Sequence, residues 1–382
     1  MDPIFDLIKQ ETERQRKQVQ LIPSENFISE EVKSALGSDL SNKYAEGYPG
    51  KRYYQGNKIV DEIEQLAIDR GKKLFGVPHL NVQPYSGSPA NMAVLVGLLE
   101  HGGKFYGMQL SAGGHLTHGH PGVTFSGKYF QSMQYGVNEE GKIDYEKMAQ
   151  DVEREKPKLI FVGATAYPWI LEWEKFSRMA KSVNAWLVAD VSHIAGLIVG
   201  GVHPDPAPFV DIITSTTHKT LRGPRGAIIG VTENGLAKDP EAAKKIDKSV
   251  FPGLQGGPHL NNIAAMAVAF EEASRPEFKK YAEQIVKNSI VLAQTLKSEG
   301  LKVLGTENHL MLIDVGEGMG KEVAQRLEEN DIIVNKNTIP NEQGSPFRPS
   351  GLRIGTPAMT TRGWVEKDFE ELGKRMAQII KK

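Results

Sequence analysis

The sequence predicts an α/β protein with a large domain built on a mostly parallel sheet and a smaller domain that follows it. Short apolar runs alternate with amphipathic helical patterns through the middle of the chain. This alternation is typical of a parallel sheet covered by helices on both faces. The chain has 382 residues, and at that length one hydrophobic core usually gives way to two. We therefore expect two domains.

The amino-terminal region is predicted to contain two helices separated by a loop. Pro3–Val19 has apolar residues on one face and a proline in its first turn, which suits a helix. Asn42–Gly56 is rich in glycine and tyrosine and has no period, so we expect a loop there. Helical spacing returns over Asp61–Phe75.

Residues 70–260 are assigned to the large domain. Its apolar runs predict buried strands at Leu159–Gly163, Trp186–Asp190, Ile212–Thr217 and Ala227–Val231. Helical patterns lie between several of these runs, at Tyr145–Glu155 and Glu172–Ser182. A strand, helix, strand order of this kind favours parallel crossovers.

Residues 261–382 are assigned to linking helices and a smaller α+β domain. The linking helices are predicted over His259–Ser274 and Glu277–Glu299. The predicted strands of the small domain are His309–Val315 and Ile332–Asn335, and its predicted helices are Lys321–Asn330 and Glu366–Ile380.

Composition excludes several classes of function. Lys and Arg number 46 against 47 Asp and Glu, a net charge of −1, which argues against nucleic-acid binding. The absence of cysteine excludes disulfides, thiolate metal sites and a cysteine nucleophile, and it fits a reducing compartment. The charged amino terminus is not a signal peptide, and the apolar runs are shorter than the roughly 20 residues of a membrane span. We expect a cytoplasmic protein without membrane contact.

Asp190 and Lys219 are the strongest candidates for chemistry. Each follows or ends a predicted buried strand, and ligands bind at the carboxyl ends of parallel strands. A poorly hydrated lysine has a lowered pKa and becomes a better nucleophile. An aspartate and a lysine placed this way suit pyridoxal phosphate, in which lysine forms a Schiff base and the carboxylate keeps the pyridine nitrogen protonated. On this pair alone, a buried salt bridge is the favoured interpretation.

Two further segments suggest ligand contacts. Ser86-Gly87-Ser88 precedes a helical run, and with Ser88 as N-cap its backbone N–H groups would hold a phosphate. Arg353 could clamp a substrate carboxylate, although a structural ion pair is equally consistent with it. Each signal is weak by itself.

A histidine-rich turn and the tyrosine-rich loop complete the candidates. His115, His118 and His120 lie within six residues of each other, which suggests a metal, a ring stacked on a flat cofactor, or a polar turn. The metal is the least favoured of these, since the segment has no acidic residue. In the loop, Glu46 stands among tyrosines, an arrangement that suits acid–base work or a subunit interface.

In this order along one chain, the motifs resemble the serine hydroxymethyltransferase family of pyridoxal-phosphate enzymes. The resemblance runs from about Leu21 to the carboxyl terminus, and motifs of this length are far more specific than a single short pattern. The motifs are LIPSENF, NKYAEGYPGKRYY, GGHLTHG, TTHKTLRGPRG, VFPGLQGGP, NKNTIP and GLRIGTPAMTTRG.

The resemblance implies a fold-type I, aspartate aminotransferase-like architecture with a mainly parallel seven-stranded sheet in the large domain. It also implies that residues 1–69 form an arm that carries a loop for the dimer and the active site. The implied active unit is a homodimer with shared sites, and a tetramer is also compatible with it. Neither a membrane nor nucleic acid is expected as a binding partner.

The resemblance implies the following roles. Lys219 forms the Schiff base with His218 beside it, and Glu46, Tyr54 and His115 are the other catalytic residues. The implied cofactor-binding residues are Ser86, Gly87, Ser88, His115, Thr165, Asp190, His193, Lys219, Tyr44 and Gly256. Substrate is implied to bind at Ser24, Arg353, Tyr54 and Glu46, with Arg225 supporting Tyr54. Folate is implied to bind at Tyr53, Leu110, Gly114, Leu116 and Asn337, and no metal site is implied.

The implied activity is reversible transfer of the serine hydroxymethyl carbon to tetrahydrofolate, through aldimine and quinonoid forms of the cofactor. The products are glycine and 5,10-methylenetetrahydrofolate. A folate-independent aldolase or transaldolase acting on 3-hydroxy amino acids such as allo-threonine is the alternative. A non-enzymatic descendant and a metal enzyme are weaker alternatives. The chain departs from the family pattern at Tyr85, Pro89, Ala112, Thr165, Ala227 and Arg348-Pro349.

Overall fold

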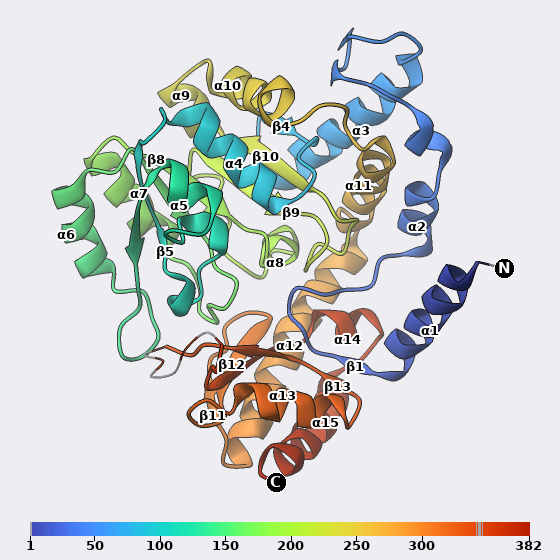
Figure 1. The fold of residues 1–382 in the computed structure, drawn as a ribbon, viewed down its shortest axis with the longest axis vertical. Helices are drawn as coiled ribbons and strands as arrows, with labels where there is room; N and C mark the ends of the chain where they lie inside the picture. Colours follow the sequence, from blue (N-terminus) through green and yellow to red (C-terminus); the bar gives the residue numbers. More distant parts are fainter. Residues whose placement is uncertain (1, 341, 343–344, 346) are drawn as a thin grey trace.

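The structure, a computed structural model, describes residues 2–340, 342, 345 and 347–382. A seven-stranded sheet in the order β4-β10-β9-β8-β7-β5-β6 forms the centre of the large domain, and a four-stranded sheet in the order β11-β12-β15-β14 forms the small one. Figure 1 shows the large domain above the small one, and the long helix α12 (Pro276–Ser298) runs from one to the other.

The central sheet is mainly parallel, as predicted. Its strands are β4 (His79–Asn81), β5 (Lys104–Met108), β6 (Gln131–Tyr135), β7 (Leu159–Val162), β8 (Trp186–Asp190), β9 (Ile212–Thr216) and β10 (Ala227–Val231). Among them, β10 alone runs antiparallel to its neighbours, β9 and β4. The four strands predicted from apolar runs are present within one residue of their expected bounds. The strands β4, β5 and β6 were not predicted: β4 has three residues, β6 is mostly polar, and β5 begins with a lysine and contains a glycine.

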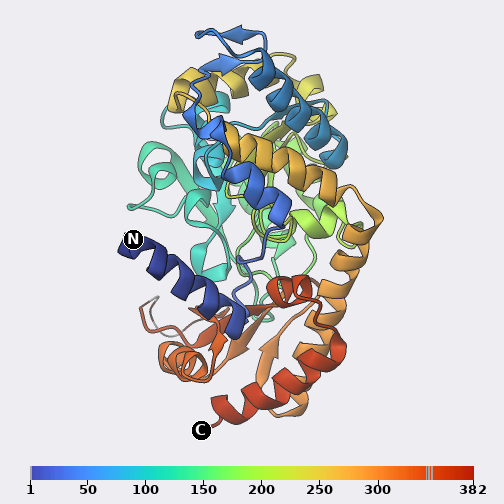
Figure 2. The ribbon, with the colours of Figure 1, turned by 90° about the vertical axis from the view of Figure 1, so that its right-hand side faces the viewer.

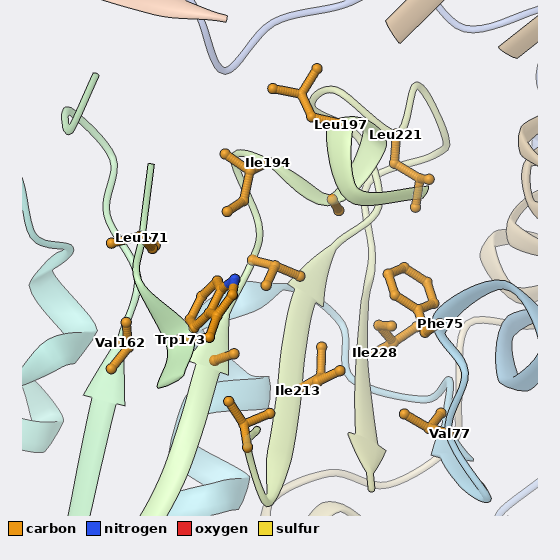
Figure 3. Packing of buried hydrophobic residues seen from close by; sticks show 14 of the residues in the cluster. Phe75, Val77, Val162, Leu171, Trp173, Ile194, Leu197, Ile213, Leu221 and Ile228 are labelled. Atoms are coloured by element: carbon orange, nitrogen blue, oxygen red, sulfur yellow. The ribbon is translucent and has the colours of Figure 1, made fainter. Parts of the chain in front are cut away.

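Helices cover both faces of this sheet and create two separate cores. On β7, Ile160 and Val162 belong to one core, whereas Leu159 and Phe161 belong to the other. Because successive side chains of a strand point to opposite faces, a strand buried on both sides is apolar throughout. Figure 3 shows part of the larger core, with Phe75 near one end and Trp173 toward the other.

The helices of the large domain are divided between the two cores. They are α3 (Lys58–Phe75), α4 (Gly87–Leu98), α5 (Phe125–Tyr129), α6 (Tyr145–Glu155), α7 (Trp173–Ser182), α8 (Ala195–Val199), α9 (Glu233–Lys238), α10 (Ala242–Lys248) and α11 (Leu260–Ala273). Short helical turns are η2 (Leu110–Ala112), η3 (Leu116–His118) and η4 (Ser249–Leu254). Helices α3, α7 and α11 pack into the larger core, and α4 and α10 pack into the smaller one.

The small domain surrounds its own apolar core. Its elements are β11 (Lys302–Leu304), β12 (Leu310–Asp314), α13 (Gly320–Glu328), β13 (Ile332–Ile333), β14 (Asn335–Asn337), β15 (Gly351–Gly355), α14 (Pro357–Thr361) and α15 (Glu366–Ile380). The prediction of one strand over Ile332–Asn335 is wrong. The segment divides because β13 pairs in parallel with β1 (Val19–Gln20), whereas β14 pairs with β15.

The amino-terminal segment lies on the outside of the molecule. It comprises α1 (Pro3–Lys17), α2 (Glu30–Leu36), η1 (Asp39–Asn42) and a hairpin of β2 (Gly47–Tyr48) and β3 (Lys51–Arg52). No residue of α1 is buried in this chain, and Figures 1 and 2 show this helix at the edge of the molecule beside the small domain. In the described part of the chain, no helix is long and apolar enough to cross a membrane.

A buried arginine fixes the hairpin against the large domain. Arg52 lies 2.6 Å from Glu64 and 2.8 Å from Asp61, and it also donates to the backbone carbonyls of Ala45 and Gly47. The side chains of Arg52 and Glu64 are only 3% and 1% exposed. Removing either partner of such a pair leaves an uncompensated buried charge.

We therefore predict that Arg52→Ala destabilises the protein by about 3–5 kcal/mol. Chemical denaturation of the cofactor-free protein would measure this change. Arg178→Ala is the matched control, because the Arg178–Glu174 pair on α7 is 66% and 69% exposed and surface pairs contribute little. Equal effects of the two variants would contradict a dominant role for the buried pair.

Candidate active site

A cavity of about 590 Å³ lies at the carboxyl ends of the large-domain strands. Segments that follow β5, β7, β8 and β9 line it, together with the start of α4 and one residue of β15. Most of the residues predicted from the sequence meet here: Ser24, Ser86, Gly87, Ser88, Leu110, Gly114, His115, Leu116, Thr165, Asp190, His193, His218, Lys219, Arg225 and Arg353.

Asp190, at the end of β8, is a buried carboxylate with several donors. Its Oδ2 accepts from Nδ2 of Asn91 at 2.8 Å and lies 3.0 Å from Nε2 of His118, and its Oδ1 accepts from the Ser192 hydroxyl at 2.6 Å. The backbone N–H of His115 donates to Nδ1 of His118, so the proton of that ring is on Nε2. Burial raises the pKa of Asp190, but these hydrogen bonds outweigh burial and hold it well below its usual range. The carboxylate is charged at neutral pH.

Lys219 lies three residues beyond β9 and is 9% exposed. Burial lowers its pKa to about 8, an effect that Asp190 opposes and that Arg353 and Arg225 reinforce. Among the described residues no salt bridge joins Lys219 to Asp190, since the carboxylate is occupied by other donors. The salt-bridge interpretation of this pair is therefore wrong, and about a tenth of the amine is uncharged at pH 7, far more than for an ordinary lysine.

Arg353 reaches the cavity from the small domain. It lies in the middle of β15 rather than after a loop, between Leu312 of β12 and Asn335 of β14. Its Nε donates to Oδ1 of Asn335 at 3.1 Å, and its Nη1 donates to the carbonyl of Thr165 at 2.7 Å. Burial lowers its pKa to about 10. Within the described ranges, Arg353 forms no salt bridge. Its guanidinium is therefore available to donate hydrogen bonds to a carboxylate in the cavity.

The start of α4 forms a cradle at one end of the cavity. The prediction that Ser88 is its N-cap is wrong, because the backbone is already helical at Gly87 and Ser86 is the N-cap. A Cβ on Gly87 would lie 2.8 Å from Cγ2 of Thr216, so only glycine lets the helix approach β9 this closely. The buried hydroxyl of Thr216 has no partner among the described residues. Free N–H groups and a hydroxyl at a helix start fit a phosphate.

Three neutral histidines line the same cavity. Burial lowers the pKa of His115 to about 4 and of His218 to about 3, and it lowers the pKa of His193 well below its usual value. Nδ1 of His115 lies 2.7 Å from the Thr117 hydroxyl. Because His118 instead points to Asp190, the histidine-rich turn supports the carboxylate. Within the described residues no group of three or more His, Cys, Asp or Glu is arranged to hold a metal.

Comparison with known proteins identifies the family. The family model described as "Serine hydroxymethyltransferase" matches residues 1–376. The chain belongs to the serine hydroxymethyltransferase family. Curated serine hydroxymethyltransferases from Nostoc sp., Desulfotalea psychrophila and Francisella tularensis subsp. novicida are 53%, 50% and 51% identical to it. Each alignment covers 99% of this chain and 88%, 88% and 90% of the respective relative.

A second cluster contains the predicted residues from the tyrosine-rich loop of this serine hydroxymethyltransferase family member. The rings of Tyr44 and Tyr54 meet edge to face with centroids 5.3 Å apart, and the charge of Glu46 raises the pKa of Tyr54. A Cβ on Gly256 would lie 3.0 Å from Oε1 of Glu46. Tyr44 and Tyr54 are 55% and 46% exposed. None of the four lines the cavity described above.

The two remaining folate candidates also lie away from the cavity wall. Tyr53 is 71% exposed, and its ring packs edge to face on Phe251 with centroids 5.7 Å apart. Asn337 ends β14, and its side-chain amide donates to the carbonyl of Thr338.

Tyr85, a departure from the family pattern, links the cradle to the glycine-rich segment after η4. Its ring stacks on His259 with centroids 4.1 Å apart, and its hydroxyl donates to the carbonyl of Gly257 at 2.7 Å. Its backbone N–H donates to Oε1 of Gln255 at 3.0 Å. The cradle of the first site and the Gly256 segment of the second cluster are thus held together within one chain.

Sequence reasoning missed the residues that support the site. Asn91 holds Asp190 and accepts from the Thr214 hydroxyl, and Asn335 holds Arg353. His118 was noticed only for its spacing. Asn91 is a polar residue in the otherwise apolar run of α4 and is 1% exposed. Since buried amides are almost always hydrogen-bonded, an amide in such a run was the available signal.

The buried histidines should make the cofactor-free protein sensitive to acid. Burial lowers the pKa of five rings, those of His115, His193, His203, His218 and His309. Below the ordinary value of 6.5, the unfolded chain takes up protons on these rings and the folded chain does not. The free energy of unfolding should therefore fall between about pH 6.5 and pH 5, by up to roughly 1.4 kcal/mol per pH unit for each ring.

Urea unfolding across this pH range measures the effect. His218→Asn should reduce the slope of the free energy of unfolding against pH by the contribution of one of the five rings. His101→Asn is the control, since His101 is exposed, and it should leave the slope unchanged. A wild-type slope that is flat from pH 7 to pH 5 would contradict the neutral state of the buried rings.

Proposed function

We propose that this protein catalyses the reversible transfer of the hydroxymethyl carbon of serine to tetrahydrofolate, giving glycine and 5,10-methylenetetrahydrofolate. The observation that carries the proposal is one cavity that contains a buried lysine, a charged aspartate and an arginine without an acidic partner among the described residues. Membership of the family over nearly the whole chain supports it. We also propose a cytoplasmic location, which fits a chain without cysteine.

Pyridoxal phosphate fits the residues of this cavity. The unpartnered Thr216 hydroxyl and the close approach at Gly87 suit its phosphate, and the charged Asp190 suits a protonated pyridine nitrogen. When bound, the cofactor supplies an electron-withdrawing ring for the α-carbon of an amino acid. The residues that would hold it are Ser86, Gly87, Ser88, His115, Thr165, Asp190, His193 and Lys219.

Lys219 would bind the cofactor, and Arg353 would bind the substrate. The uncharged share of the Lys219 amine, which burial increases, makes it the nucleophile that attaches to the cofactor aldehyde. Arg353 would bind the substrate carboxylate by two parallel hydrogen bonds, with Ser24 beside it in the cavity wall. Fixing the carboxylate orients the bonds at the α-carbon, and this orientation decides which bond breaks.

The second cluster would complete the site of another subunit. Tyr44, Glu46, Tyr54 and Gly256 lie together and partly exposed, but away from the cavity of their own chain. In a homodimer they would face the partner's cavity, where Glu46 and Tyr54 would handle the proton of the substrate hydroxyl, and Tyr44 and Gly256 would reach the phosphate. Lys219 of one chain and Glu46 of the other would then belong to one site.

Tetrahydrofolate would bind at the mouth of the cavity. Leu110, Gly114 and Leu116 line its wall, and Leu116 is 45% exposed. An exposed leucine beside a polar cavity suits the flat ring system of a pteridine. Tyr53 and Asn337 would contribute from outside this wall, Tyr53 from the partner.

The deciding experiment measures conversion of serine to glycine by the cofactor-loaded protein, with and without tetrahydrofolate. We expect conversion that depends on folate, and loss of turnover in Lys219→Ala, which should keep its circular dichroism spectrum. Lys33→Ala, at an exposed residue, is the control. If the protein cleaves allo-threonine and tetrahydrofolate has no effect on serine conversion, the proposed activity is wrong and the aldolase alternative is supported. A protein that neither converts serine nor binds the cofactor would contradict both the proposed activity and the aldolase alternative.

Mixing inactive variants tests the shared site. Glu46→Gln and Lys219→Ala should each be inactive alone. After subunit exchange, half of the dimers are mixed and one of their two sites carries both intact residues, so activity should recover to about a quarter of wild type. Glu46→Gln mixed with wild type should keep half of the wild-type activity whether or not subunits exchange, so it controls for losses caused by the mixing procedure. A mixture that stays inactive while heterodimers form would place Glu46 in the site of its own chain.

A further inference from the structure

A small cavity adjoins the active-site cavity and shares part of its wall. Its volume is about 10 Å³, which is room for a single water molecule. Asp190 and His193 line both cavities. Residues of the small domain close the far side, among them Asn308 and His309. The wall between the two cavities therefore consists of side chains that face the proposed cofactor site.

Three side chains on the wall of this small cavity carry a buried ring nitrogen with no hydrogen-bond partner among the described residues. They are Nε1 of Trp169, Nε2 of His203 and Nδ1 of His309. The relative exposure of His203 is 6% and of His309 is 0%. An unsatisfied buried polar atom costs about 1–3 kcal/mol, so three around one cavity indicate a shared polar partner.

The hydrogen-bonding roles of these nitrogens are complementary to water. Trp169 can only donate. Nδ1 of His203 lies 3.3 Å from the carbonyl of Pro204, so it carries the proton of this neutral ring and Nε2 is an acceptor. Burial lowers the pKa of His203 to about 4, which keeps the ring neutral. A water molecule can accept from Trp169 and donate to His203 at the same time.

The third nitrogen connects the small cavity to the active site. Nε2 of His309 lies 3.3 Å from Nδ1 of His193. Burial lowers the pKa of His309 to about 3 and the pKa of His193 well below its usual value, so each ring has one proton. If His193 donates, Nδ1 of His309 is a donor and Nε2 of His193 is a bare acceptor. If His309 donates, both of those roles reverse.

We propose that one structural water in this cavity joins Trp169, His203 and His309, and that the orientation of this water is coupled, through His309, to which nitrogen of His193 carries the proton. With either tautomer the water has three partners, because it can accept from His309 or donate to it by turning in place. Three is the usual number for a buried water. His309 is a positioning residue, since it acts on the active site only through His193.

This inference rests on the proposed function in one respect, because His193 matters to catalysis only if the cavity binds the cofactor. The water and the tautomer of His193 are properties of the cofactor-free protein, so they are tested there. A protein that holds the water and fails to convert serine would overturn the proposed function alone. A protein that converts serine without the water would overturn this inference alone.

A crystal structure of the cofactor-free protein is the first test. We expect one ordered water within hydrogen-bond distance of all three nitrogens, in the loaded protein as well. A cavity without solvent density, or a direct protein partner for any of the three nitrogens, would overturn the proposal.

Histidine-selective nitrogen NMR is the second test, with a matched pair of variants. His203→Phe removes an acceptor and keeps a ring, so the water has a hydrogen to donate to Nδ1 of His309. We then expect the two nitrogen resonances of His193 to shift toward the tautomer protonated on Nε2. Leu171→Val alters the wall of the same cavity without touching a polar atom and should leave those resonances unchanged. Trp169→Phe removes a donor instead of an acceptor, so it should shift those resonances in the opposite direction, and it serves as the test if His203→Phe does not fold. Equal effects of the polar and apolar variants, or no effect of either, would show that the cavity acts only by packing.

Discussion

A charged carboxylate that has been removed from water must be surrounded by donors, and this requirement of Asp190 organises the active-site cavity. Its hydrogen bonds reach Asn91 on α4, His118 on η3 and Ser192 just beyond β8. Asn91 in turn accepts from Thr214 of β9. One charge thus connects four elements whose ends form the cavity. The same saturation leaves Lys219 without an anionic partner among the described residues, and burial can then lower its pKa.

The architecture explains why these groups meet. In a parallel sheet, the segments that follow neighbouring strands emerge at one edge, so residues far apart in the sequence share one wall. The small domain contributes a cationic side chain to the cavity. Its strand β15 carries Arg353, which reaches the loop after β7. The site is therefore divided between a rigid sheet edge that suits a cofactor and a separate domain that suits a substrate.

How much could be predicted from the sequence depended on how each element is buried. Strands β7, β8 and β10 are almost entirely apolar and were found, as was β9, which begins with two isoleucines, whereas β4 and β6 are mostly polar and were not. Long motifs placed the cavity residues in one site. The family resemblance also implied that Glu46 and Tyr54 serve the site of the partner subunit, and neither residue lines the cavity of its own chain. Composition and spacing alone could not indicate this, because they do not state which copy of the chain a residue serves. Supporting residues such as Asn335 were missed, since their roles come from partners distant in sequence.

The hydrogen bond between Arg353 and Thr165 has a mechanical consequence. Arg353 is fixed in the middle strand of the small-domain sheet, and the Thr165 carbonyl belongs to the loop after β7. The guanidinium has five N–H donors, of which Asn335 and Thr165 take two. Under the proposed function, a substrate carboxylate would bind to the remaining donors while the bond to Thr165 is kept. The small domain would then be fastened both to the ligand and to the loop after β7, and moving it away from the sheet would break both contacts.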